Sequence, residues 1–193
     1  MKLTRDIQIS LSQVLRSAII QAYSDAQINS STPSNASLYL DTLRASGSGW
    51  HVCLNVLISE TPVADSSSAW QVDVVTFFGL STIARFLQEK RVRALQDRTL
   101  IRDQVFVHAT AAVPYPSYIV TKQALVLALC VKSDYPMGWR DPFGQLIKVS
   151  GAHPELFCRV LQALVDEVVD FSDQRSKEEV RERERLREFS EGP

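Results

Sequence analysis

Histidines and adjacent acidic residues are the side chains in this sequence that could act as acids, bases or metal ligands. Three histidines occur, and His51 and His108 fall in segments with a helical pattern, whereas His153 precedes a proline at an expected helix start. Asp166 and Glu167 form an acidic pair, but adjacent residues on a helix point about 100° apart and do not share one site. We therefore expect the histidines to be structural or exposed and the acidic pair to belong to a polar helix face.

The sequence also lacks the short motifs that mark common catalytic and cofactor sites. It contains no GxGxxG, GxxxxGK[ST], GxSxG or HExxH string, and each of these motifs serves a defined chemistry. The three cysteines, Cys53, Cys130 and Cys158, are scattered and include no CxxC pair, so we interpret them as reduced core residues. We predict no catalytic residue, no cofactor and no metal site, and the sequence favours a binding protein over an enzyme.

Basic residues gather around one expected turn between two long helices. These residues are Lys90, Arg91, Arg93, Arg98 and Arg102. Such a cluster can meet phosphate groups or an acidic protein surface. Acidic residues, namely Glu89, Asp97 and Asp103, are interleaved with it, so an ordinary solvated surface is the competing interpretation. The formal net charge of −1 adds no global attraction to nucleic acid.

Apolar residues recur at helical spacing along most of the chain. One such stripe comprises Phe157, Val160, Leu161, Leu164, Val165 and Val168, and another comprises Phe77, Leu80, Ala84 and Leu87. We expect helices at about 5–25, 35–45, 50–60, 69–90, 94–112, 117–134, 139–150, 154–171 and 176–190. The side chains expected to be buried are Trp50, Phe78, Leu125, Trp139, Phe157 and Leu161. Asn-Gly and Asp-Gly turns between alternating apolar residues are absent, so no strand is predicted.

The spacing of these helices predicts their arrangement. Short connections imply antiparallel neighbours, and about four pairs at intervals of about 40 residues match HEAT-type repeats. The predicted fold class is therefore an all-α HEAT-repeat α-solenoid spanning 1–193, with a compact helical bundle as the alternative. Residues 28–34 are expected to form a surface loop, and 172–193 a charged terminal helix and tail. The opening segment is too polar for a secretory signal, and the longest apolar run, 124–131, is too short to span a bilayer, so we expect no membrane insertion.

A string of aromatic residues and prolines links two of the expected helices. From Tyr135 the sequence runs YPMGW and then DPF: the tyrosine and proline stop one helix, and the tryptophan and phenylalanine anchor the next. This string resembles the Tyr-Pro-x-x-Trp-x-x-Phe-Phe signature near the amino end of exportins in the importin-beta superfamily. The stretches 37–57, 77–90, 118–136 and 157–171, in this order, are similar to the first repeats of the tRNA-exportin (exportin-T) family. Thr121 stands where that family usually has Asn, and Pro142 replaces an aromatic residue and is expected to delay the start of its helix.

The resemblance implies a function as well as a fold. Members of this family are far longer solenoids, so the chain resembles an amino-terminal fragment of a tRNA nuclear export receptor. The implied partners are Ran-GTP, tRNA in the full-length receptor and nuclear pore proteins, and the implied localisation is shuttling between nucleus and cytoplasm. The candidate contacts to Ran or tRNA are Arg98, Arg102, Lys148, Lys90, Arg91 and Arg93. The alternative is a HEAT-repeat protein-binding scaffold, or a general karyopherin, that binds no RNA.

Overall fold

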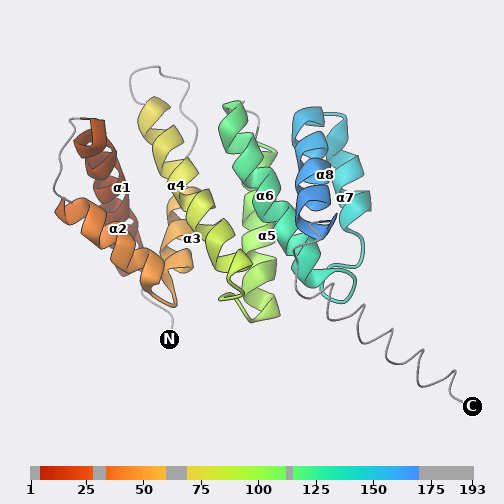
Figure 1. The fold of residues 1–193 in the computed structure, drawn as a ribbon, viewed down its shortest axis with the longest axis horizontal. Helices are drawn as coiled ribbons and strands as arrows, with labels where there is room; N and C mark the ends of the chain where they lie inside the picture. The colour runs from red at the N-terminus through yellow and green to blue at the C-terminus, as the bar shows by residue number, and fades with distance from the viewer. Residues whose placement is uncertain (1–4, 28–33, 60–68, 112–114, 170–193) are drawn as a thin grey trace, which may run out of the picture.

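A computed structural model describes residues 5–27, 34–59, 69–111 and 115–169 of the 193-residue chain. Within these ranges the chain forms eight α-helices and no strand (Figure 1). The helices are α1 (Arg5–Gln27), α2 (Asn35–Ala45), α3 (Gly49–Ser59), α4 (Ala69–Gln88), α5 (Leu95–Ala109), α6 (Ser117–Asp134), α7 (Pro142–Ser150) and α8 (Pro154–Val169). The predicted all-α helical-repeat fold is confirmed.

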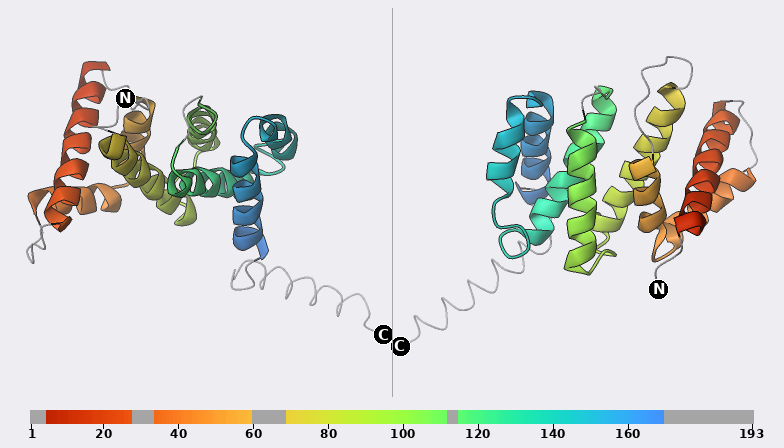
Figure 2. Two further views of the ribbon diagram at one scale, coloured as in Figure 1. Left: turned by 90° about the horizontal axis from the view of Figure 1, so that it is seen from above. Right: turned by 180° about the vertical axis from the view of Figure 1, so that it is seen from behind.

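The helices are arranged in two layers along one direction. Helices α1, α4, α6 and α8 pack side by side in sequence order, and α3, α5 and α7 form the second layer (Figures 1 and 2). Each helix of the second layer packs against the helix that follows it, so α3 contacts α4, α5 contacts α6 and α7 contacts α8. Helix α2 packs mainly against α1. The stack therefore grows by repetition, as in a solenoid.

The core runs between the two layers as a continuous band of apolar side chains. Its fully buried members include Leu15, Leu80, Ile83, Phe86, Ile101, Leu127, Leu146 and Val160. The side chain of Leu57 on α3 lies close to Gly79 on α4, where a Cβ atom would come within 3.2 Å of it. Glycine at this position therefore lets the two layers approach closely.

Most side chains expected to be buried are enclosed by this core. Trp50, Phe78 and Trp139 are buried, and Leu125 and Phe157 are partly buried and pack against the core. The prediction for Leu161 is wrong, because its side chain is 37% exposed. The packed face of α8 is formed by Leu156, Val160 and Leu164, and Leu161 lies about 100° away from that face.

The buried-cysteine prediction holds for two of the three residues. Cys53 and Cys130 are fully buried, and burial raises the pKa of each thiol to about 12. Cys158 is exposed on α8, so its assignment to the core is wrong. It follows Phe157 on a helix whose packed face is carried by other positions, and it therefore faces outward.

Prolines and caps explain where the last described helices begin. Helix α7 starts at Pro142 rather than at 139, because proline favours the first helical turn, as anticipated for this residue. The carboxylate of Asp141 caps it by accepting a hydrogen bond from the amide of Gly144 at 2.9 Å. Helix α8 begins at Pro154. Of the expected loop 28–34, only Ser34, the N-cap of α2, is described, and the expected helix 176–190 lies outside the described residues.

None of the helices in the described ranges is long and apolar enough to cross a membrane.

Candidate functional site

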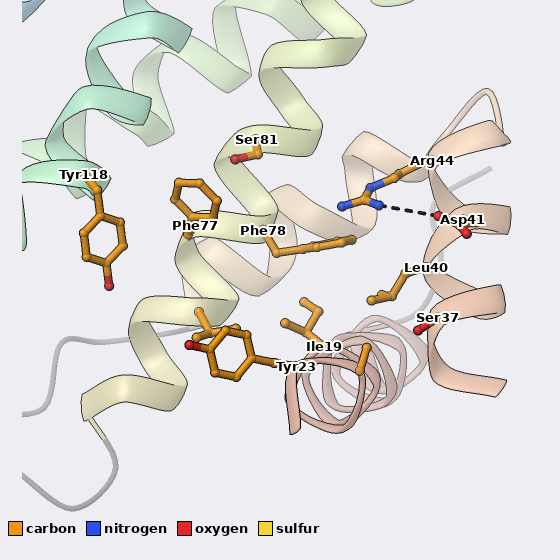
Figure 3. A pocket seen from close by; sticks show the side chains of 12 residues that line it. Ile19, Tyr23, Ser37, Leu40, Asp41, Arg44, Phe77, Phe78, Ser81 and Tyr118 are labelled. Atoms are coloured by element: carbon orange, nitrogen blue, oxygen red, sulfur yellow. Dashed lines mark hydrogen bonds and ion pairs between the residues drawn. The ribbon is translucent and has the colours of Figure 1, made fainter. Parts of the chain in front are cut away.

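An apolar groove of about 700 Å³ opens over α4, with α1 and α2 on one side and α6 on the other (Figure 3). Its floor is a stripe of α4 that repeats at helical spacing and comprises Val74, Phe77, Phe78 and Ser81. The walls are Ile19, Ala22 and Tyr23 of α1, Ser37, Leu40, Asp41 and Arg44 of α2, and Tyr118 of α6. Three helices that are distant in sequence thus meet along α4.

Exposed aromatic rings surround this groove. The rings of Tyr23 and Trp70 are 6.0 Å apart, and the rings of Phe77 and Tyr118 meet edge to face at 5.7 Å. All four side chains are between 38% and 48% exposed. Aromatic groups gathered on one surface in this way are typical of sites that bind a partner through apolar contacts.

The groove has few polar groups, and its charged side chains lie over aromatic rings or pair with one another. The Arg44 guanidinium lies 4.7 Å from the centre of the Phe78 ring, and the Lys122 ammonium lies 5.5 Å from that of Phe77. Burial, and secondarily the carboxylate of Asp73, raises the pKa of Tyr118. Among the described residues, no cluster of three or more His, Cys, Asp or Glu side chains could hold a metal ion. The arrangement suits binding of an apolar segment.

The basic residues predicted around the turn between α4 and α5 differ from one another in their surroundings: some bind other groups of the chain and others are exposed. The Arg91 guanidinium donates hydrogen bonds to the carbonyl oxygens of Arg44 and Ala45, each at 2.7 Å, and of Ser46 at 2.5 Å. It also lies 4.1 Å from the centre of the Phe86 ring. Arg91 is therefore committed to contacts within the chain.

Arg98 and Arg102 of α5 also have partners within the fold. The Arg98 Nε donates to the buried carboxylate of Asp134 at 2.6 Å, and its Nη1 donates to the carbonyl oxygen of Arg93, also at 2.6 Å. Arg102 pairs with Asp103 at 2.8 Å and lies 4.9 Å from the centre of the Trp139 ring. These two side chains are only 18% and 14% exposed.

The remaining three predicted contacts are exposed. Lys90 and Arg93 lie beside Arg91 in the α4–α5 turn, and Lys148 lies in the last turn of α7. Within the described residues, no ion pair involves any of these three side chains. The structure thus brings Lys90, Arg91 and Arg93 together in one turn and places Lys148 on a separate element.

Sequence reasoning did not identify the aromatic groove. Phe77 was assigned to an apolar stripe with Leu80, but it is 38% exposed whereas Leu80 is fully buried. The available signal was the spacing of Trp70 and Phe77, seven residues apart on one helix face. The sequence did not show that α1 and α6 would bring Tyr23 and Tyr118 to that face.

The two-layered stack and its extended surfaces define a helical-repeat protein of the HEAT type. Comparison with known proteins then shows what the chain is similar to: residues 116–189 match the model of the family described as "Exportin 1-like protein". The chain is also similar to Exportin-T of Arabidopsis thaliana, with 27% identity over 180 residues, which cover 86% of this chain. These matches confirm the predicted resemblance to exportins.

The similarity covers only a small part of the relative. The matched region corresponds to 17% of the length of the Arabidopsis protein. No solved structure matches the chain.

Proposed function

We propose that this chain forms an amino-terminal part of a nuclear export receptor for tRNA that acts with Ran-GTP. The observation that carries the proposal is the exportin 1-like match over 116–189, which covers α6, α7 and α8 of a HEAT-type stack. The similarity to Exportin-T over most of the chain supports tRNA as the cargo class. Such a receptor shuttles between nucleus and cytoplasm.

The exposed basic residues are the proposed contacts to Ran-GTP. Lys90, Arg93 and Lys148 carry exposed charges, whereas Arg91, Arg98 and Arg102 support the surface through contacts within the fold. Binding by this region alone should be weak and sensitive to salt, because few exposed charges contribute and the net charge of the chain is −1. The tRNA contact should be weaker still, since it depends on repeats beyond the matched 17% of the relative.

The aromatic groove is a second proposed contact surface, for nuclear pore proteins. It offers apolar floor and aromatic rim but few polar groups. A partner segment that presents apolar side chains could bury them there. The two surfaces lie on different elements, so the Ran contact and the nuclear pore contact can be changed separately.

Titration of labelled Ran, loaded with GTP or with GDP, tests the proposal at two salt concentrations. We expect binding to Ran-GTP only, with affinity falling as salt rises. The double variant Lys90→Gln with Arg93→Gln, and the single variant Lys148→Glu, should each weaken it. The double variant Gln13→Glu with Ser17→Glu on α1 is the control, because it changes the net charge equally at exposed positions. Equal binding of both nucleotide states would contradict the Ran assignment.

A protein-binding scaffold without RNA contact is the second candidate, and the mainly apolar character of the groove favours it. The same titration repeated with added tRNA separates the two functions. A receptor for tRNA should bind Ran-GTP more tightly at tRNA concentrations high enough to occupy its weak tRNA contact, because binding of the two ligands is coupled. A scaffold should show no change.

A further inference from the structure

Helix α2, which forms one wall of the aromatic groove, is held less firmly than the floor of the groove. It packs against α1 and, less extensively, against α3. Its buried side chains are Leu40 and Leu43, whereas α4 is buried along most of its length. The position of α2 relative to α4 therefore depends on few contacts.

Three hydrogen bonds to the end of α2 come from Arg91, in the turn after α4. Its guanidinium reaches the carbonyl oxygens of Arg44, Ala45 and Ser46, at the end of α2. The last carbonyl groups of a helix have no partner within the helix and carry a partial negative charge. A guanidinium satisfies several of them at once, because its donors form a rigid fork.

Arg91 is itself fixed by its surroundings. Its guanidinium stacks over the ring of Phe86, 4.1 Å from the ring centre, and donates to the Glu89 carboxylate at 3.3 Å. Its backbone amide donates to the carbonyl oxygen of Phe86 at 2.9 Å, after Lys90 adopts a left-handed conformation with φ of 54°. The turn thus holds the Arg91 side chain between the Phe86 ring of α4 and the end of α2.

A second arginine makes contact on the groove side of the same helix end. Arg44, whose carbonyl oxygen is bound by Arg91, places its guanidinium over the ring of Phe78 on the groove floor (Figure 3). It also pairs with Asp41 at 3.5 Å, which keeps both side chains on the groove wall. The end of α2 is therefore connected to α4 in two ways: through Arg91 in the turn after α4, and through Arg44 on the groove floor.

We propose that Arg91 is a positioning residue that sets the width of the aromatic groove. Its hydrogen bonds to the carboxyl end of α2, called the latch below, hold that end against the α4–α5 turn. When these hydrogen bonds are lost, α2 keeps its contacts with α1, and its carboxyl end moves away from α4 as far as the short link of residues 46–48 to α3 allows. This inference goes beyond the proposed function, because it holds whichever partner enters the groove. A lysine at this position offers one ammonium in place of a planar fork, so it restores the latch only in part.

Distance measurements between spin labels test the latch directly. The labels are attached through Thr42→Cys on α2 and Ser133→Cys on α6, both exposed positions, in a chain that also carries Cys158→Ser. The remaining cysteines are fully buried and take no label. We expect Arg91→Ala to give a longer and broader distance distribution, and Arg91→Lys an intermediate one.

A control pair separates movement of α2 from a general loosening of the fold. Labels at Ser17→Cys on α1 and Ser133→Cys on α6 lie in the same layer, and neither is attached to α2. Their distance distribution should be unchanged by Arg91→Ala. An unchanged distribution for the α2 pair overturns the proposal, and so does an equal change in both pairs.

Binding of an apolar dye reports on the groove itself. Fluorescence of 1-anilinonaphthalene-8-sulfonate should rise in Arg91→Ala above that of the unchanged protein, because a wider groove exposes more of its apolar floor. Adding Phe77→Ser, an exposed position on that floor, should remove the increase. An increase that persists with Phe77→Ser would place the dye elsewhere and count against the latch.

Discussion

A buried ion pair links the end of α6 to the start of α5. The side chain of Asp134 is fully buried, and its Oδ1 accepts a hydrogen bond from Arg98 Nε at 2.6 Å. The backbone carbonyl of Asp134 accepts from the amides of Gly138 and Trp139 at 2.6 and 3.0 Å. One residue therefore organises both the α5–α6 contact and the turn that leads to α7.

Removing the arginine of this pair should destabilise the fold strongly. We expect Arg98→Ala to lower the free energy of unfolding by about 3–5 kcal/mol, because a buried carboxylate is left without its partner. Urea denaturation followed by circular dichroism measures this loss. The double variant Arg98→Met with Asp134→Leu is the control and should lose less, since no charge remains buried. For the same reason, variants of Arg98 are unsuitable for testing partner binding.

His108 of α5 contacts Gln123 of α6 with one ring nitrogen and Tyr115, in the linker before α6, with the other. The amide of Gln123 donates to Nδ1 at 2.9 Å, so Nε2 carries the proton and donates to the Tyr115 hydroxyl at 2.8 Å. The Tyr115 ring is also stacked on the imidazole, with ring centres 4.6 Å apart. Burial lowers the pKa of His108 from 6.5 to about 4. The histidine is thus neutral in the folded protein at physiological pH.

Acid should weaken the fold through His108. The unfolded chain binds a proton below pH 6.5 and the folded chain only near pH 4, so stability is present above pH 6.5 and is lost as the pH falls toward 4. Between pH 7 and pH 5 this amounts to about 2 kcal/mol. Urea denaturation at the two pH values measures the free energy of unfolding. Between pH 7 and pH 5 this free energy should fall less in His108→Gln than in the unchanged protein. The variant His153→Gln is the control, and an equal loss in both variants would contradict the prediction.

At the scale of elements, the close contact between α3 and α4 depends on the absence of a side chain at Gly79. A Cβ there would lie 3.2 and 3.3 Å from two carbon atoms of Leu57, so a large side chain has no room. We expect Gly79→Leu to destabilise the protein by about 1–3 kcal/mol. Gly151→Ala is the control, because nothing lies within 4 Å of its Cβ. Thermal unfolding followed by circular dichroism measures both variants, and equal midpoints would contradict the close-packing argument.

The elements themselves were largely predictable because helical spacing and helix-breaking residues are local signals. The bounds of α2 and α6 agree with the sequence prediction, and the effect of Pro142 on the start of α7 was anticipated. Leu161 and Cys158 were misassigned because an apolar or small residue on a helix shows which face could be buried but not which face meets a neighbour.

The site was less predictable than the helices because it depends on which helices are neighbours. The basic turn between α4 and α5 was expected, yet the sequence did not show that Arg91 reaches the end of α2 or that Arg98 pairs with Asp134. These contacts join residues that lie 46 and 36 positions apart in the chain. The same reasoning explains why the groove between α1, α2, α4 and α6 was missed.

At the scale of the whole molecule, stability is distributed along the stack. Helix α6 packs against α4, α5 and α8, whereas α1 packs mainly against α2, α3 and α4. In a repeat protein, each interface stabilises mainly the helices on its two sides. Truncating a buried side chain in a central helix should therefore destabilise more of the neighbouring helices than truncating an equally buried side chain in the first helix.

Leucines in α6 and α1 give a matched pair for this test, because Leu127 and Leu15 are both fully buried. Truncation to alanine at either position should lower stability by about 2–5 kcal/mol through the loss of packed atoms. Hydrogen exchange followed by mass spectrometry then shows where protection is lost. We expect Leu127→Ala to speed exchange in α4, α5 and α8 as well as in α6, since all three pack against it. Leu15→Ala should speed exchange in α1, α2, α3 and α4 and leave α7 and α8 as protected as before. Uniform loss of protection in both variants would show that the protein unfolds as one cooperative unit, with no gradient along the stack.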